Sequence, residues 1–442
     1  MDIEKLKQKI LDLAIRGKLV SQDPNDEPAS VLIEKIRKEK EELIKQGKIK
    51  RDKNESYIYK GSDNCYYEKI GSEVKNITDE IPFDIPTNWT WCRFKTVLVV
   101  RDGTHDSPKY YSDGVPFVTS KCLKNNTIDF SLCKLISLED SKRFDERSFV
   151  DDKDILFAMI GTIGNATIVN KDREFSIKNV ALFKNINRQL LSEKFIKYLL
   201  DCLTSKMIEK TSSGLQPFVS LEFLRNYIIP IPPIQEQIKI IGKLDAIFGK
   251  LITIQDDRNS LLSLIDNVKN KILDYYFGDN SCYKSYYENN ITLGDVLSYE
   301  QPWKYTVEST NYDDSYNTPV LTPGKTFILG YTNETTGIYD VGKSKVIIFD
   351  DFTTASRLVD FNFKVKSSAM KILTSVDSDK FDIEYLFYLL QTINVISNTH
   401  KRYWISEYMP ICVNIHAINE QKKIVNKINT MFTILNSMSN SI

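Results

Sequence analysis

Ile234-Gln235-Glu236-Gln237 begins a stretch of 44 residues, 234–277, that contains no proline and repeats one pattern of side chains every seven residues. Seven of its ten seam positions are apolar, and the seam runs through Ile241, Leu244, Phe248, Leu251, Gln255, Arg258, Leu262, Ile265, Lys269 and Ile272. Such a seam covers one helix face, so we expect long helices that pack as a coiled coil. Its polar positions predict a looser seam around 255–258.

The same pattern returns 184 positions later, where Ile418-Asn419-Glu420-Gln421 begins another helical stretch. Five apolar positions after the first motif match five after the second: Ile240, Ile241, Leu244, Phe248 and Leu251 against Ile424, Val425, Ile428, Phe432 and Leu435. Tyr198-Leu199-Leu200 recurs as Tyr388-Leu389-Leu390, and residues 3–12 resemble residues 265–274. These matches predict one unit used twice in a pseudo-twofold arrangement, with the C-terminal helix paired with the N-terminal ones.

The texture of the chain divides it into six segments. Short apolar runs such as Val115–Val118 and Ile155–Ile160, separated by Gly, Pro, Asn and Asp, are typical of strands. We expect an α+β protein with two strand-rich domains separated by long antiparallel coiled-coil-like helices. The predicted segments are a helical region 1–50 (helices 3–15 and 29–46), a polar linker 51–80, a strand-rich domain 81–233 with a helix at 192–207, a helical region 234–280, a second strand-rich domain 281–415 and a C-terminal helix 416–442.

Composition limits the classes of function. The chain has 59 basic and 59 acidic residues, so any contact with DNA must come from local clustering of cations. Seven cysteines occur without a CxxC pair, which argues against a disulfide framework or a zinc site and favours a reducing cytoplasm. The N-terminus has no apolar signal core and no later stretch reaches 18 uninterrupted apolar residues, so we expect a cytoplasmic protein without a membrane partner.

Several motifs resemble the specificity subunits of type I restriction-modification systems. They are Leu6–Leu11 with Gly17–Val20, Asp23–Ala29, Gly114–Phe117, Phe175–Asn179 and Ile231–Gln237. The resemblance covers essentially the whole chain, although His416-Ala417 replaces the Pro-Pro of the first copy. It implies two target-recognition domains that read a bipartite double-stranded DNA target and direct adenine methylation and restriction by other subunits. The implied partners are two methyltransferase subunits carrying S-adenosylmethionine, and the resemblance leaves open a motor-nuclease subunit that uses ATP.

The sequence agrees with a subunit that has no cofactor of its own. It contains no GxxxxGK[ST] phosphate loop, no Asn-Pro-Pro-aromatic motif and no glycine-rich cofactor turn of the expected spacing. Its three histidines, His105, His400 and His416, are too far apart in sequence to suggest a ligand cluster. We therefore predict no catalytic residues and no metal site.

Polar side chains on loops are the candidates for contact with DNA, because bases are read by donors and acceptors that enter a groove. Solvated turns are the alternative for each. The first domain offers Thr104, His105, Ser107, Thr119, Ser120, Lys121, Thr162, Asn165, Lys178 and Asn179. The second offers Gln301, Lys304, Tyr305, Thr322, Lys325, Tyr331, Asn333, Thr353, Thr354, Ser356, Arg357, Lys366 and Ser367.

For two groups of charged residues, a role other than contact with DNA can be named. Arg357 and Lys366 are the predicted contacts to guanine edges or phosphates, whereas an ion pair of Arg357 with Asp350 or Asp351 would be purely structural. The basic run from Lys35 to Lys53 is interleaved with acids, which favours a solvated helix face or a contact with a partner subunit over DNA.

Two other classes of function compete with DNA recognition. A stand-alone nuclease would use carboxylates such as Asp151, Asp152 and Asp154, and would cut plasmid DNA in the presence of magnesium. A symmetric scaffold that binds only proteins would select no sequence from a random-site DNA library.

Overall fold

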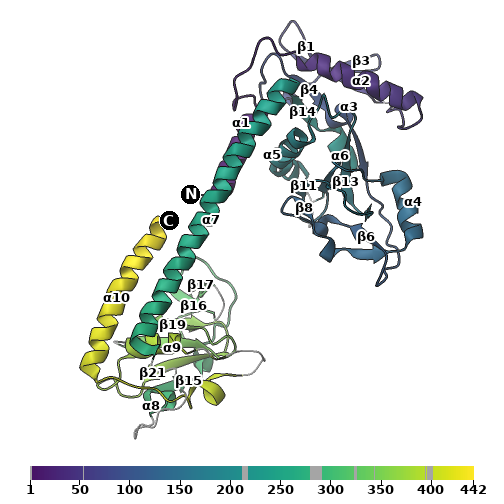
Figure 1. The fold of residues 1–442 in the computed structure, drawn as a ribbon. Coiled ribbons are helices and arrows are strands. Elements are labelled where there is room, and N and C mark those ends of the chain that lie inside the picture. Colours follow the sequence, from purple (N-terminus) through teal and green to yellow (C-terminus); the bar gives the residue numbers. More distant parts are fainter. Residues whose placement is uncertain are drawn as a thin grey trace. The chain divides into compact units, whose positions relative to one another are not determined.

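The computed structural model describes residues 2–52, 54–211, 218–278, 291–322, 326–342, 344–393, 395 and 402–442. The chain divides into two compact units, Met1–Thr253 and Ile254–Ile442 (Figure 1). Each unit combines helices with antiparallel and mixed sheets, which confirms the α+β class with two strand-rich domains. Within the described ranges, no helix is long and apolar enough to cross a membrane.

The two predicted N-terminal helices are present as α1, Ile3–Ile15, and α2, Ala29–Lys45. Leu11, Ala14 and Ile15 of α1 are buried in the main core of the first unit. Gly17 ends this helix in the left-handed region at φ +68°, which glycine tolerates because it has no Cβ. The apolar spacing therefore located both helices to within a residue.

The segment expected to be a polar linker instead forms a sheet. Strands β1, Ser56–Lys60, β2, Tyr66–Ile70, and β3, Glu73–Asn76, pair antiparallel in that order. Glu68 forms an ion pair with Arg93 of β4, Thr90–Arg93. Burial alone would raise the pKa of Glu68, but the hydrogen bonds from Arg93 lower this pKa below its usual value. These three strands bury few apolar side chains, so the alternation of apolar and polar residues along them was too weak to identify from the sequence.

The remaining elements of the first unit form its strand-rich domain. Its helices are α3 Phe94–Val97, α4 Leu138–Ser148, α5 Glu193–Thr211 and α6 Leu221–Asn226. Its short 3-10 turns are η1 Thr78–Glu80, η2 Ser120–Cys122 and η3 Phe130–Leu132. Its strands are β5 Leu98–Asp102, β6 Val115–Val118, β7 Leu123–Lys124, β8 Thr127–Ile128, β9 Lys134–Ile136, β10 Ile155–Ala158, β11 Gly164–Ile168, β12 Ser176–Ile177, β13 Val180–Asn185 and β14 Ile228–Ile231.

The central sheet of this domain, ordered β11-β10-β13-β5, is buried on both faces. Ile155 and Phe157 of β10 face one core, which includes residues of α5, whereas Leu156 and Ala158 face a second core. Successive side chains of a strand point to opposite faces, so burial on both sides requires an unbroken apolar run. The run Ile155–Ile160 has this character.

The second unit repeats the topology of the first. Its elements are α8 Leu293–Val296, β15 Leu297–Glu300, η5 Pro302–Tyr305, β16 Thr318–Leu321, β17 Ile328–Thr332, β18 Val346–Asp350, β19 Ser356–Val359, β20 Lys364–Val365, β21 Met370–Ser375, α9 Ile383–Gln391, the π-helical η6 Trp404–Tyr408 and α10 Ile418–Ser441. Order β19-β18-β21-β15 corresponds to β11-β10-β13-β5, and β20-β16-β17 corresponds to β12-β6-β9. In each of these two three-stranded sheets one pair is parallel, β6 with β12 and β16 with β20. The duplication predicted from short sequence matches therefore extends through both sheets.

The repeated helix motif places one buried glutamine at the same position in each unit. The Gln237 amide donates to Pro232 O (3.1 Å) and Leu190 O (3.3 Å) and accepts from Ser192 N (3.0 Å). The Gln421 amide donates to His416 O (2.8 Å) and Lys380 O (2.9 Å) and accepts from Asp382 N (2.7 Å). Both side chains are fully buried. Each glutamine thus joins the start of a long helix to the turn that precedes α5 or α9.

The central stretch is one continuous helix, α7, Ile234–Phe277, with no break at the polar seam positions. All ten predicted seam positions are buried or half-buried, while most positions between them are exposed. In the second unit α10 runs antiparallel to the end of α7 (Figure 1), and the Lys269 ammonium lies 6.0 Å from the centre of the Phe432 ring. The pairing of α10 with the N-terminal helices and the pseudo-twofold relation of the units stay predictions.

Replacing Gln421 by alanine should destabilise the second unit by about 1–3 kcal/mol, because the backbone N–H of Asp382 and the carbonyls of Lys380 and His416 lose their buried partner. Hydrogen exchange measured by mass spectrometry should become faster in α9 and α10. Gln237→Ala should have the same effect on α5 and the start of α7. The matched control is Asn426→Ala, an exposed amide on α10, and equal effects of Gln421→Ala and Asn426→Ala would contradict the assignment.

Candidate nucleic-acid interface

The loop that follows β5 is joined to the end of β12 by backbone contacts. Thr104 N donates to Ile177 O (3.1 Å), and Asn179 N donates to Thr104 O (3.3 Å). A Cβ on Gly103 would lie 2.3 Å from Ile177 O, so only glycine permits this approach. Residues more than 70 positions apart are thereby held beside one another.

Five predicted contact residues meet in this loop pair. The two ring nitrogens of His105 lie 2.6 Å from Asn179 Oδ1 and 3.0 Å from Asp102 Oδ2. The Lys178 ammonium donates to Ser107 Oγ (2.6 Å). His105 and Ser107 are exposed, whereas Asp102 is buried, so a buried carboxylate orients an exposed ring. Thr104, His105, Ser107, Lys178 and Asn179 together form a polar cluster that we name the first loop cluster.

Thr119, Ser120 and Lys121 follow β6 next to this cluster. Lys178 N donates to Val118 O (2.9 Å), which fixes the two strand ends side by side. The Cys133 thiol donates to Cys122 Sγ (3.2 Å), and this hydrogen bond lowers the pKa of Cys122, whose sulfur also accepts from Thr119 N (3.4 Å). Two of the cysteines therefore lie side by side. Between the described residues, no group of three or more His, Cys, Asp or Glu could hold a metal ion.

Thr162 and Asn165 lie in the turn between β10 and β11. Thr162 is exposed. Asn165 has φ +49°, and its side-chain amide donates to Leu123 O (3.1 Å), which ties the turn to the segment after Thr119. The structure thus connects this turn to the same end of the domain through Leu123.

In the second unit the sheet register identifies the equivalents of the first loop cluster. Val118 pairs with Ile177 in one unit and Leu321 with Val365 in the other, so Thr322 corresponds to Thr119 and Lys366 to Lys178. Lys366 N donates to Leu321 O (2.9 Å), as Lys178 N does to Val118 O. Ser367 follows and accepts from Ala369 N (3.2 Å). Lys325 lies outside the described residues.

The turn between β18 and β19 and the start of β19 carry four of the predicted residues. Thr353 donates to Asp350, Thr354 has φ +63°, and Ser356 Oγ accepts from Gln391 Nε2 (2.6 Å). The exposed Arg357 guanidinium lies 5.9 Å from the centre of the Phe327 ring.

The acids proposed as structural partners of Arg357 contact other groups. Asp351 pairs with the buried Lys371 at 3.0 Å and accepts from Trp404 N at 2.8 Å. Asp350 accepts from Thr353 and from Phe352 N (3.0 Å). Between the described residues, no ion pair joins Arg357 to either acid, so its charge stays available to an external anion.

The other predicted residues of this unit are more dispersed. Gln301, Lys304 and Tyr305 lie at or next to η5, where the Tyr305 hydroxyl donates to Glu300 Oε1 (3.2 Å) and the Lys304 ammonium lies 3.8 Å from the same carboxylate. Tyr331 lies on β17, opposite Pro319 of β16, and Asn333 follows that strand. Tyr305 therefore has a structural partner, which favours packing over contact with bases.

Asp102 and Arg147 were not predicted from the sequence, yet they support the first loop cluster. Arg147 of α4 donates to Asp102, which in turn holds His105. The two residues are 45 positions apart on a strand and a helix, and neither lies in a recognisable motif. No sequence signal could have joined them, because the contact arises from packing of α4 beside β5.

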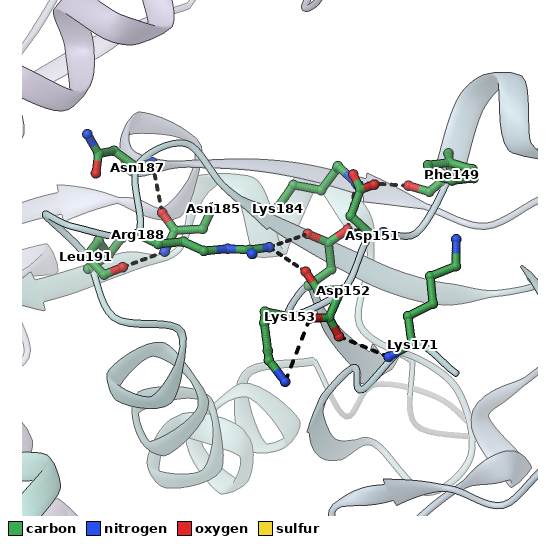
Figure 2. Close-up of polar contacts among 11 residues, drawn as sticks. Phe149, Asp151, Asp152, Lys153, Lys171, Lys184, Asn185, Asn187, Arg188 and Leu191 are labelled. Atoms are coloured by element: carbon green, nitrogen blue, oxygen red, sulfur yellow. Dashed lines mark hydrogen bonds and ion pairs between the residues drawn. The ribbon is translucent and has the colours of Figure 1, made fainter. Parts of the chain in front are cut away.

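The carboxylates that suggested a nuclease are held by cations of the same domain. Figure 2 shows Asp151, Asp152 and their neighbours, and the Lys184 ammonium lies 2.7 Å from Asp151 Oδ2 and 2.6 Å from Asp154 Oδ2. Arg188 donates to the backbone oxygen of Asp152 at 2.6 Å and lies 3.8 Å from Asp154 Oδ1. Burial raises the pKa of Asp154, while the Lys184 hydrogen bond opposes that rise. The group is a charge-neutralised structural network, because lysine occupies the position between the carboxylates.

These observations define a class of protein built by duplication, in which one strand-rich domain followed by a long helix occurs twice and presents polar loops at matching positions. Residues 87–263 match the family model of the type I restriction modification DNA specificity domain. The second unit repeats its topology.

Curated relatives match parts of the chain. It is 57% identical over 120 residues to the specificity subunit of the type I restriction enzyme EcoR124I/EcoR124II of Escherichia coli, covering 27% of this chain and 30% of that protein. It is 33% identical over 260 residues to the EcoEI specificity subunit of Escherichia coli, covering 56% of this chain and 40% of the relative. The matches thus span between 30% and 40% of the length of these two relatives.

A solved structure described as the structural basis underlying complex assembly and conformational transition of the type I R-M system contains a similar chain. The similarity covers 81% of this chain and 94% of that one, with a TM-score of 0.56 and 16% identity. At this identity the similarity establishes the fold.

Gly103→Ala should destabilise the first unit by about 1–3 kcal/mol, because its Cβ would overlap Ile177 O and push the two loops apart. The matched control is Gly249→Ala on α7, where a Cβ meets nothing within 4 Å and should stabilise the helix by about 0.5–1 kcal/mol. Urea unfolding measures both changes. A shift of the same sign in both variants would show that the approach of the two loops is not as close as described.

Proposed function

We propose that this chain is the DNA-recognition subunit of a type I restriction-modification complex and reads a bipartite double-stranded target. The observation that carries the proposal is the duplicated domain with equivalent strand ends and different loop residues. Thr119 in the first domain corresponds to Thr322 in the second, and Lys178 corresponds to Lys366. The sequence beside these matched positions differs, because Ser120-Lys121 follows Thr119 whereas Pro323-Gly324 follows Thr322, and Ser367 stands in place of Asn179. Equivalent scaffolds with unlike loops are suited to reading two different half-sites.

The division of labour in the proposed complex follows from what the loops offer. Hydroxyl, amide and cationic groups can recognise base edges and phosphates, which is the role that we assign to these loops. Adenine methylation and restriction would belong to partner subunits that carry S-adenosylmethionine and ATP. We therefore propose a non-catalytic, cytoplasmic subunit without a cofactor of its own.

The long helices suit a second role as docking surfaces for methyltransferase subunits. Ile252, Ile254, Leu261 and Leu264 of α7 are all exposed, as is Ile434 of α10. Several exposed apolar side chains along helices are typical of protein interfaces. Two similar surfaces created by duplication would bind two copies of one partner.

The target should consist of two different short sequences separated by a fixed number of unread base pairs. The 44 residues of α7 correspond to about 66 Å at roughly 1.5 Å per residue. Deleting residues 254–257, about one helical turn, should shorten or abolish the tolerated spacer and leave both half-sequences unchanged. Both quantities are measured by mapping methyladenine in the genome of a host that co-expresses the variant chain with its methyltransferase subunits.

A substitution of four residues of α7 by alanine, with unchanged length, is the control for this deletion. Altered half-sequences with the original spacer would mean that α7 does not set the distance. Methylation that follows no sequence would instead favour the protein-only scaffold, and magnesium-dependent cutting by the purified chain would favour the nuclease.

The assembled complex should contain two methyltransferase subunits per copy of this chain, measured by native mass spectrometry. Leu261→Glu with Leu264→Glu should weaken binding of a methyltransferase subunit at least about tenfold, since charge would enter an apolar contact. Leu138→Glu, an exposed leucine on α4, is the matched control. An active complex with only one methyltransferase subunit would contradict this stoichiometry. Tight binding of S-adenosylmethionine to the isolated chain would contradict the proposed division of labour.

A further inference from the structure

A cleft of about 1140 Å³ in the first unit gathers positive charge from four elements that are distant in sequence. Its walls are mainly the segment after α2, strand β5, the second half of α4, and α6, with Lys40 of α2 and Lys95 of α3. Nine cationic and four acidic side chains line it: Lys40, Lys48, Lys50, Arg51, Lys95, Arg101, Arg143, Arg147 and Arg225 against Asp52, Asp102, Glu146 and Glu222. In a chain with equal numbers of basic and acidic residues, this is a local surplus of cations.

Some of these cations are neutralised by carboxylates. Arg51 pairs with Glu41 at 2.5 Å, and Lys95 lies 3.4 Å from Asp52. Arg147 pairs with Asp102. These pairs build the walls of the cleft and leave little charge for a ligand.

Four other cations keep their charge. Arg101 Nη1 donates to Arg147 O (3.1 Å) and Arg225 Nε donates to Val100 O (2.9 Å), and backbone carbonyls orient a guanidinium without cancelling its charge. Lys48 and Lys50 are exposed, and between the described residues neither forms an ion pair. Glu146 and Glu222 offset part of this charge, so the cleft offers spaced cations and not one strong anion site.

The cleft borders the first loop cluster. Asp102 lines the cleft and holds His105 at 3.0 Å, and Arg143 of the cleft lies 3.9 Å from Asp106. A polyanion that passes through the cleft would therefore reach the loops proposed to read bases. A DNA backbone has this continuity, since its phosphates flank every base, whereas an acidic peptide segment would need no connection to those loops.

We propose that this cleft binds the phosphodiester backbone of the duplex beside the half-site read by the first domain. The inference rests on the proposed function and adds to it a part of the site that positions DNA without reading sequence. Guanidinium forks and lysine ammonium groups are suited to phosphate oxygens. Lys48 and Lys50 thus contribute to a DNA surface, where the sequence alone favoured a solvated face or a partner contact.

The test measures binding of the purified full chain to a 30-base-pair duplex of random sequence by fluorescence anisotropy, at several salt concentrations. Lys48→Ala with Lys50→Ala should weaken binding about tenfold near 0.1 M salt and reduce the slope of log K against log salt by about 1.8, or about 0.9 per lost phosphate contact. Both lysines are exposed, so the fold should persist, and circular dichroism checks this. Lys18→Ala with Lys69→Ala, exposed lysines of the same unit outside the cleft, is the matched control.

Sequence preference, measured as the ratio of affinities for a selected and a random duplex, separates this inference from the proposed function. Unchanged affinity and slope in the cleft variant, with preference intact, would overturn the inference alone. The loss of slope in a chain that prefers no sequence would support the cleft and overturn the proposed function. Absence of any DNA binding would overturn both, and weaker binding of a protein partner with unchanged DNA affinity would assign the cleft to that partner.

Discussion

The buried amides of Gln237 and Gln421 are the interaction on which each unit depends. Each bonds two backbone carbonyls and one backbone N–H at the junction of a long helix with the strand-rich domain. A buried amide left without partners is costly, so the three segments that meet there must keep one geometry. A second pair of equivalent contacts supports the same junction, because Tyr198 bonds Asp245 and Tyr388 bonds Asn429.

This constraint explains how two domains with different loops keep one framework. The sheets are buried on both faces, as Phe157 and Leu156 illustrate in the first unit and Phe349 and Ile348 in the second. Close-packed cores tolerate few changes of volume, whereas loops at the strand ends can vary. Packing shared by the two copies, with unlike loops, is the arrangement that the proposed recognition of two unlike half-sites requires.

The distribution of charge matters more here than its sum. Lys184 neutralises Asp151 and Asp154 inside the first domain, while Arg101 and Arg225 bond only carbonyls where they line the basic cleft. Glu236 is buried and accepts from Trp89 (2.9 Å) and Gln22 (3.0 Å), but its counterpart Glu420 is partly exposed. The copies thus share their central junction and differ in the groups that surround it.

The sequence by itself determined the N-terminal, central and C-terminal helices and the duplication of a strand-rich unit. Periodic apolar positions report burial directly, and the matched motifs beginning at Ile234 and Ile418 report one unit used twice. It also indicated Lys178 and Asn179 as candidate contact residues, without their partners. Only the tertiary structure decided that His105 lies between Asp102 and Asn179, that residues 56–76 form a sheet, and that Lys48 and Lys50 line a cleft with Arg101 and Arg225. The physical reason is that such contacts join side chains from distant segments, and local patterns of hydrophobicity carry no information about which distant segments will pack together.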